Sequence, residues 1–104
     1  MLLVSVIIPF RGDAATLNWT LDGFARQQLP ADLLVDVRVG GDGCTPPAPP
    51  AGNSCVRFIV RSLDRCGVAG AKNLLLSGVQ SDVLIFANAD TRPDANFVAT
   101  HVSR

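Results

Sequence analysis

An amide and a carboxylate stand two positions apart directly after an apolar run near the end of the chain. Asn88 and Asp90 flank Ala89, and residues 83–87 before them are all apolar. Residues two apart in an extended segment point the same way, so both polar side chains can face one ligand. A carboxylate suits a hard cation, and an amide suits a hydroxyl group. The pattern favours a ligand site, and a simple turn ahead of residues 92–94 is the alternative.

Three stretches of the chain predict strands of a parallel sheet. Residues 83–87 predict a strand buried on both faces, because no polar residue alternates with the apolar ones. Residues 3–8 form an apolar and β-branched run that predicts an interior strand. Residues 33–39 predict a strand in which Asp36 and Arg38 share one face. This alternation indicates a partly exposed face, nearer the edge of the sheet.

Apolar residues at helical spacing predict helices between and after the strands. Asp13 is a candidate N-cap of the first helix, which should end near Gln28. Residues 67–77 open a second helix. Its expected buried stripe consists of Val68, Ala71, Leu75 and Val79. A third helix starts after Pro93, and residues 95–104 look like its beginning, as expected for a piece of a larger protein.

The stretches between these elements predict turns, connectors and one more strand. Residues 40–45 turn sharply, and residues 46–54 hold four prolines and form an irregular connector. Residues 55–60 predict a third short strand, and residues 61–66 a loop. Strands alternating with helices in this way imply an α/β fold, a mostly parallel Rossmann-like sheet with flanking helices and right-handed crossovers.

The exits of three predicted strands share one kind of composition. Residues 10–13, 41–45 and 88–90 each combine acidic or hydrogen-bonding side chains with glycine or another small residue. Ligands of open parallel sheets bind beyond the carboxyl ends of the strands. We therefore expect the three loops to meet at one ligand site.

Composition limits the class of protein. The 104 residues suit a single core, and 48% of them are hydrophobic. Nine basic residues balance nine acidic ones, so no basic field predicts nucleic-acid binding. Residues 1–9 predict a strand rather than a signal peptide or membrane anchor. Three cysteines without metal-type spacing favour reduced thiols in a cytoplasmic protein.

Several familiar motifs have no support. Residues 40–43 lack dinucleotide-fingerprint spacing, and residues 67–72 lack the gap and hydroxyl of a Walker loop. The helix start near Gly67 favours an anion with Lys72 nearby, or else its glycines only allow close helix–sheet packing. His101 is the one histidine and reads as a surface helix residue, so no hydrolase triad can be assembled.

Four blocks resemble, in order, the motifs of family 2 glycosyltransferases with the GT-A fold. Residues 4–17 resemble V-S-V-I-I-P-x-Y-N-R-x-x-x-L, and residues 39–45 resemble the V-V-D-D-G-S-T turn. Residues 64–73 resemble N-x-G-x-A-x-A-R-N, and residues 84–94 resemble L-x-F-L-D-A-D-D-x-P, which contains the D-x-D metal motif. The resemblance implies a truncated GT-A fold. Residues 1–104 would be a single partial domain, the nucleotide-diphosphate-sugar-binding half of a glycosyltransferase.

The resemblance implies a role for each matched residue. Asp90 would be the D-x-D carboxylate that binds Mg²⁺ or Mn²⁺, and Asn88, in place of the first aspartate, would hydrogen-bond a ribose hydroxyl. Asp42 would accept a hydrogen bond from the base, although the base-reading aspartate of the family aligns with Gly41. Arg11 stands at a tyrosine position, where its guanidinium can stack on the base. The predicted nucleotide-sugar site comprises Pro9, Phe10, Arg11, Asp42, Lys72, Asn88, Ala89 and Asp90.

The implied function is metal-assisted, hexosyltransferase-like transfer of a sugar from a nucleotide-diphosphate-sugar donor to an unknown glycan, lipid or protein acceptor. The catalytic base and the acceptor half lie beyond this region in the family, so this portion alone is expected to be inactive. The protein would be cytoplasmic or peripheral at the inner membrane face, with membrane association only through regions outside this sequence. The alternative is a non-catalytic nucleotide-binding or interaction module, which Asn88 and Gly41 motivate. A nucleotidyltransferase is a weaker option because its glycine-rich signature loop is absent.

Overall fold

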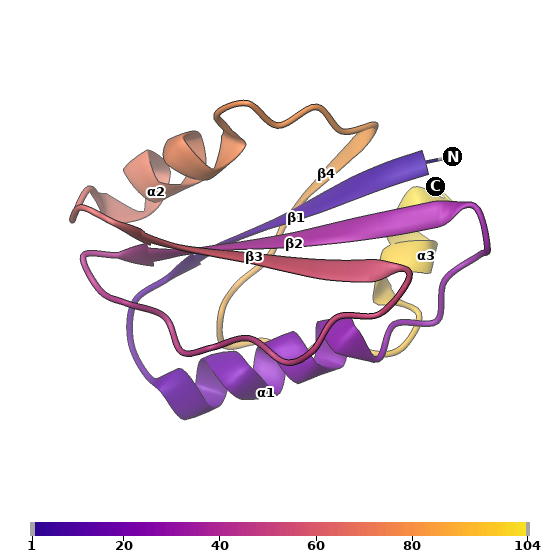
Figure 1. The fold of residues 1–104 in the computed structure, drawn as a ribbon, viewed down its shortest axis with the longest axis horizontal. Coiled ribbons are helices and arrows are strands. Elements are labelled where there is room, and N and C mark those ends of the chain that lie inside the picture. Colours follow the sequence, from indigo (N-terminus) through magenta and orange to yellow (C-terminus); the bar gives the residue numbers. More distant parts are fainter. Residues whose placement is uncertain (1, 104) are drawn as a thin grey trace.

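A four-stranded parallel sheet forms the centre of the protein (Figure 1). The computed structural model describes residues 2–103. Within them, β1 (Leu2–Phe10), β2 (Leu33–Asp42), β3 (Val56–Leu63) and β4 (Val83–Phe86) lie in the order β3-β2-β1-β4. All three strand pairings are parallel. The carboxyl ends of the strands therefore point to one end of the sheet, as the strand–helix alternation predicted.

Helices cover both faces of the sheet (Figure 1). The helices are α1 (Ala14–Ala25), α2 (Gly67–Leu76) and α3 (Phe97–Val102). Helix α1 runs along one face with α3 near its far end, and α2 lies on the opposite face. No helix among residues 2–103 is long and apolar enough to cross a membrane.

The face of the sheet toward α1 carries the larger core. Asp13 caps α1 as predicted, because its side chain accepts hydrogen bonds from the backbone N–H groups of Ala15 and Thr16. Alternate residues of β1 and β2 point toward this helix. Together with α1 and α3 they bury Val4, Val6, Ile8, Val35, Val37, Val39, Leu17, Leu21, Phe24 and Val98. This core fixes the loop between β1 and α1 at the carboxyl end of the sheet.

The opposite face is covered by α2 only near the carboxyl ends of the strands. Ile7, Leu63, Ala71 and Leu75 form a small second core there. A Cβ at Gly40 would lie 3.0 Å from both terminal methyl carbons of Leu75, so glycine allows this close packing. The glycine that admits the helix is therefore in the sheet and not in α2 itself.

The positions of β2 and β4 in the sheet differ from those predicted. β2 lies between β1 and β3, and its Asp36 is buried rather than on an exposed face. β4 is an edge strand, and Leu84 and Phe86 are 45% and 50% exposed instead of buried. The polar alternation in β2 includes a buried carboxylate, Asp36, that pairs with a largely exposed arginine of β3. The apolar run in β4 has no neighbour on its outer side within residues 2–103.

Three strands extend further than predicted. β1, expected over residues 3–8, runs from Leu2 through Pro9 to Phe10. β2 continues through Gly40 and Gly41 to Asp42, and the chain first turns at Gly43, which has a φ of 70°. β3 continues to Leu63, in register with Asp42, so part of the predicted loop 61–66 is strand. The extension carries Asp42 to the start of α2.

Candidate functional site

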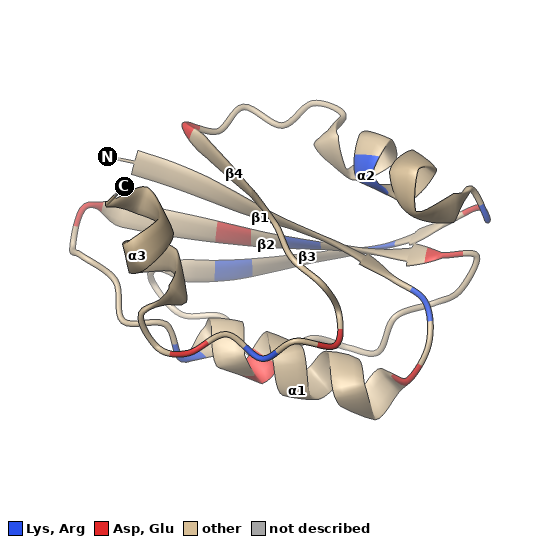
Figure 2. Cartoon of the chain, turned by 180° about the vertical axis from the view of Figure 1, so that it is seen from behind, with Lys and Arg blue, Asp and Glu red and all other residues tan. Residues whose placement is uncertain are grey.

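A cavity of about 500 Å³ opens at the carboxyl end of the sheet. It lies where β1, β2 and β4 end and where α1 and α2 begin. Acidic and basic residues of the strand-exit loops gather at this end of the molecule (Figure 2). The cavity is lined by Pro9, Phe10, Arg11, Asp13, Thr16, Asp42, Val68, Lys72, Asn88, Ala89 and Asp90.

All eight residues of the predicted site line this one cavity. They come from four segments that are far apart in the sequence, and the parallel sheet brings them together. Asp13, Thr16 and Val68 line it too and were missed as site residues. The predicted N-cap at Asp13 already placed the first two beside the β1 exit. Val68 was assigned to a buried stripe of α2, but it is mostly exposed at the cavity.

The β1 exit supplies one wall of the cavity. Phe10 is buried and anchors the wall, while Arg11 after it is exposed. The Asp13 carboxylate accepts a 2.7 Å hydrogen bond from the Thr16 hydroxyl and bonds from two backbone N–H groups. These bonds, the hydroxyl bond first, lower the pKa of Asp13. The exposed guanidinium of Arg11 is thus the β1-exit group most accessible to a ligand.

Asp42 links the cavity to the amino end of α2. Its Oδ1 accepts hydrogen bonds from the backbone N–H groups of Cys66 at 2.7 Å and Gly67 at 3.2 Å. The residue is only 6% exposed. A carboxylate at a helix N-terminus satisfies free N–H groups and interacts favourably with the helix dipole. The predicted anion site at this helix start therefore already has a carboxylate of the protein beside it.

Gly41 has no room for a side chain. A Cβ at this position would collide with the backbone oxygen of Cys44 and would lie 2.7 Å from Cδ of Pro46. The turn after β2 crosses directly over the glycine. An aspartate therefore cannot occupy position 41 in this backbone, and Asp42 is the carboxylate that the β2 exit brings to the cavity.

The hydrogen bonds to Asp42 predict acid-sensitive stability. The pKa of Asp42 is lowered from its ordinary 3.8, chiefly by the hydrogen bond from the Cys66 N–H. A carboxylate with a lowered pKa in the folded state contributes stability above its unfolded pKa and loses it as the pH falls through the folded value. We therefore expect Asp42→Asn to unfold at lower urea concentration than the natural protein at pH 7. The difference should vanish when the pH is well below 3.8.

Urea titrations of both proteins across this pH range provide the measurement. Asp64→Asn is the control, because Asp64 lies in the same connection and is exposed. It should unfold like the natural protein at every pH. A constant gap between Asp42→Asn and the natural protein down to the lowest pH would contradict the assignment.

Lys72 brings a positive charge from α2 to the cavity. Its Nζ lies 5.2 Å from the ring centroid of Phe86 in β4, within the range of a cation–π interaction.

Gly67, at the start of the helix, has a φ of 77°, a conformation that favours glycine. A Cβ at Gly67 would meet no atom within 4 Å, so this glycine serves the turn and not helix–sheet packing.

The β4 exit carries Asn88 and Asp90 to the opposite wall. Among residues 2–103, no hydrogen bond or ion pair engages the Asp90 carboxylate, and the residue is exposed. In the same range, no group of three or more His, Cys, Asp or Glu side chains is arranged to hold a metal ion. A cation would therefore depend on Asp90, the Asn88 amide oxygen and oxygens of a bound ligand. Mg²⁺ is commonly held by one or two carboxylates and substrate phosphates, so the donor set fits.

A second cavity of about 380 Å³ lies on the other side of Asn88. Aromatic residues from α1, β4 and α3 line it, among them Phe24, Phe86 and Phe97. His101 also lines it and is exposed, as predicted for a surface helix residue. Its Nδ1 lies 2.8 Å from the backbone oxygen of Phe97. The ring is thus engaged locally, within its own helix.

Comparisons with known proteins identify the fold. The sequence matches no protein-family profile and no curated protein. The structure matches crystal structures of S. aureus TarS, a family 2 glycosyltransferase. TarS 1-349 gives a TM-score of 0.73 at 16% identity, over 96% of this chain and 31% of that chain. Its complex with UDP gives a TM-score of 0.74 at 16% identity, over 96% and 31%. Its complex with UDP-GlcNAc gives 0.71 at 16% identity, over 96% and 30%.

The chain spans about a third of the TarS 1-349 chain. The match covers nearly every element described above, and a TM-score above 0.7 at low identity is evidence of a shared fold. The predicted fold class, an α/β protein with a parallel Rossmann-like sheet and flanking helices, is confirmed. The resemblance read from the four motif blocks therefore holds at the level of the fold, which is that of the GT-A glycosyltransferases.

Proposed function

We propose that this chain is the donor-binding portion of a glycosyltransferase and that its cavity binds a nucleotide-diphosphate sugar. The observation that carries the proposal is the convergence of the eight predicted residues on one cavity. The TarS structures that share the fold include complexes with UDP and UDP-GlcNAc, which supports a uridine nucleotide as the first ligand to test.

Each wall of the cavity has a group suited to one part of such a donor. The Arg11 guanidinium is planar and exposed, so it can stack on the base. Asp42 is held rigidly at α2 and can accept a hydrogen bond from an N–H of the base. Lys72 presents an ammonium group to a diphosphate. Asn88 can hydrogen-bond a ribose hydroxyl.

The charge of the cavity favours a metal-assisted donor. The cationic side chains Arg11 and Lys72 face the carboxylates of Asp13, Asp42 and Asp90. Carboxylates are in excess, so a diphosphate would add negative charge to an already acidic cavity. We infer that Mg²⁺ or Mn²⁺ binds at Asp90 and offsets that charge. When bound, such a cation stabilises the negative charge that develops on a leaving diphosphate.

The proposed reaction of the whole protein is transfer of the sugar to an acceptor that this chain does not specify. The residues that line the cavity bind and orient the donor, and the catalytic base would come from a region beyond this sequence. A non-catalytic nucleotide-binding module is the second candidate. It is favoured by Asn88 at the position where the family has a second carboxylate, because an amide contributes no charge to metal binding.

Titration calorimetry of UDP into the protein tests the proposal. We expect binding whose affinity rises on the order of 100-fold, about 2.7 kcal/mol, when Mn²⁺ is added. UMP is the matched control ligand, since it keeps the base and ribose but lacks the second phosphate. It should gain little from the metal. Binding of UDP that Mn²⁺ does not strengthen would favour the non-catalytic module, and no binding of UDP under either condition would overturn the uridine-nucleotide proposal.

A further inference from the structure

One face of α1 contacts the segment that follows β4. Thr20 and Gly23 have the spacing i and i+3, so they lie on one side of the helix, and Gln27 comes two residues after its end. Residues 89–98 run alongside this face and contact the three positions in order. The segment that contains the predicted metal ligand Asp90 is therefore held against the second half of α1 and the residues just after it.

Thr20 provides the contact nearest to the cavity. Its side chain is fully buried, and its hydroxyl donates a 2.9 Å hydrogen bond to the backbone oxygen of Ala89. Ala89 lies between Asn88 and Asp90, the two polar residues of the β4 exit. A threonine within a helix can bond a carbonyl of its own preceding turn. Here the hydroxyl instead bonds a segment 69 residues away in the sequence.

Gly23 and Gln27 hold the following residues. A Cβ at Gly23 would lie 2.8 Å from Cδ of Pro93 and 3.1 Å from its backbone oxygen, so the segment lies directly on the helix backbone. The Gln27 amide donates to the backbone oxygen of Asp94, and its Oε1 accepts a 2.9 Å hydrogen bond from the Val98 N–H. These contacts leave the segment little freedom to move away from α1.

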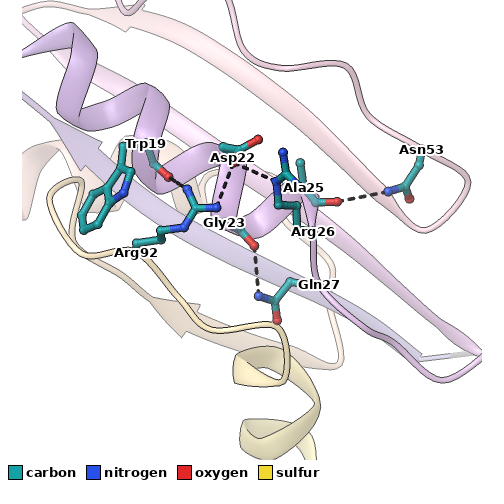
Figure 3. Close-up of polar contacts among 8 residues, drawn as sticks. All are labelled: Trp19, Asp22, Gly23, Ala25, Arg26, Gln27, Asn53 and Arg92. Atoms are coloured by element: carbon teal, nitrogen blue, oxygen red, sulfur yellow. Dashed lines mark hydrogen bonds and ion pairs between the residues drawn. The ribbon is translucent and has the colours of Figure 1, made fainter.

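Arg92 adds an ionic contact on the outer side of the same helix (Figure 3). Its guanidinium donates to the backbone oxygen of Trp19 at 2.7 Å and to the Asp22 carboxylate at 2.9 Å. Arg26 donates to the same carboxylate at 2.9 Å but makes no hydrogen bond to the segment among residues 2–103. The two arginines therefore share one partner, and Arg92 alone of the two belongs to residues 89–98.

We propose that Thr20 is a positioning residue that orients Asp90 toward the ligand. This rests on the proposed function of the cavity. The Asp90 side chain has no hydrogen bond of its own among residues 2–103, so its position depends on the backbone that carries it. A metal ligand must be held to within a fraction of an ångström, and the buried bond to Ala89 is the closest fixed point. Gly23, Gln27 and Arg92 align the rest of the segment.

Thr20→Val tests the proposal, because valine has nearly the shape of threonine and replaces the hydroxyl with a methyl group that cannot donate a hydrogen bond. We expect the Mn²⁺-dependent gain in UDP affinity to fall roughly tenfold, while the affinity without metal stays within about twofold. Thr20→Ser restores the hydroxyl and should restore the gain. A purely structural role would lower both affinities together. Thr20→Val with the full metal-dependent gain would overturn the proposal.

Arg92→Gln and Arg26→Gln form a second, matched pair. Both remove one guanidinium from the Asp22 carboxylate, but only Arg92→Gln also removes a contact between the segment and α1. Arg92→Gln should reduce the metal-dependent gain in UDP affinity severalfold, and Arg26→Gln should leave it unchanged. Equal effects of the two substitutions would show that the charge of Asp22, and not the position of the segment, is what matters.

A measurement without ligand separates this inference from the proposed function. Amide hydrogen exchange in the free protein should be faster at Ala87, whose N–H donates a hydrogen bond to the backbone oxygen of Ile7 two residues before the contact, in Thr20→Val than in Thr20→Ser. Exchange in α1 should be unchanged. If the natural protein binds no UDP, the proposed function fails while this exchange difference still tests the contact. If the natural protein binds UDP with metal and the exchange rates are equal, the positioning role alone fails.

Discussion

Asp90→Asn is expected to abolish nearly all of the gain in UDP affinity that Mn²⁺ provides, a loss on the order of 100-fold. Asp90 is the carboxylate of the β4 exit in the cavity, and no hydrogen bond or ion pair among residues 2–103 engages it. Changes to groups that merely support a metal ligand cost 10–100-fold in metal affinity, so loss of the charged ligand itself should cost about the upper value. The measurement is calorimetric titration of UDP with and without Mn²⁺.

Two further variants make this result specific. Asp94→Asn removes a charge from the same segment, but Asp94 does not line the cavity at the strand ends. It should keep the full metal-dependent gain. Asn88→Asp adds a second carboxylate beside Asp90, and it should strengthen metal-dependent binding of UDP. If Asp90→Asn keeps the full Mn²⁺-dependent gain in UDP affinity, the proposal that Asp90 binds the metal is wrong, whatever the other variants show.

The site was predictable because it depends on topology more than on side-chain detail. Once residues 3–8, 33–39 and 83–87 are read as parallel strands, their carboxyl ends must lie at one end of the sheet. Arg11, Asp42 and Asp90 follow those strands or end them, and all line one cavity. Small errors in strand length do not disturb this logic, which is why the late end of β2 left the cavity residues unchanged.

The contacts that support the site were not predictable in the same way. Thr20 lies on α1 between apolar residues, and nothing in its local sequence distinguishes it from a threonine bonded to its own helix. Its partner is a backbone oxygen 69 residues away, which has no sequence signature. Asp42 could be placed at the cavity, but its second role at α2 depends on how far β2 and β3 extend.

Strand order was the other feature that local patterns could not provide. Alternation in residues 33–39 was interpreted as an exposed face, because a charged residue usually points to water. In the structure, the Asp36 carboxylate accepts hydrogen bonds from Arg57, which is its register partner on β3. A cross-strand partner 21 residues away supplies the hydrogen bonds that allow the Asp36 carboxylate to be buried. The alternation of residue types specifies which residues share a face of the strand. Whether that face is exposed to solvent depends on the side chains of the neighbouring strand.

Asp36→Ala is expected to destabilise the protein by about 2 kcal/mol, because it removes a buried carboxylate and leaves the partly enclosed Arg38 guanidinium without that partner. The Asp36 side chain is 4% exposed and accepts hydrogen bonds of 2.8 and 3.0 Å from Arg57 and a longer one, 3.5 Å, from Arg38. The Arg57 side chain is 66% exposed and can return to water. Arg38 is more enclosed, and its buried Nε has no hydrogen-bond partner within residues 2–103, so the cost falls mainly there.

Urea unfolding of variants at neutral pH distinguishes this explanation from a general loss of packing. Arg57→Ala should cost clearly less than Asp36→Ala, since Asp36 keeps Arg38 as a counter-ion and water reaches the vacated position. Asp32→Ala, at an exposed position just before β2, should be nearly neutral. If Asp36→Ala costs no more than Asp32→Ala, the pair contributes nothing to stability. We expect stability to decrease in the order Asp32→Ala, Arg57→Ala, Asp36→Ala. Only the last substitution leaves the enclosed Arg38 side chain without its carboxylate partner.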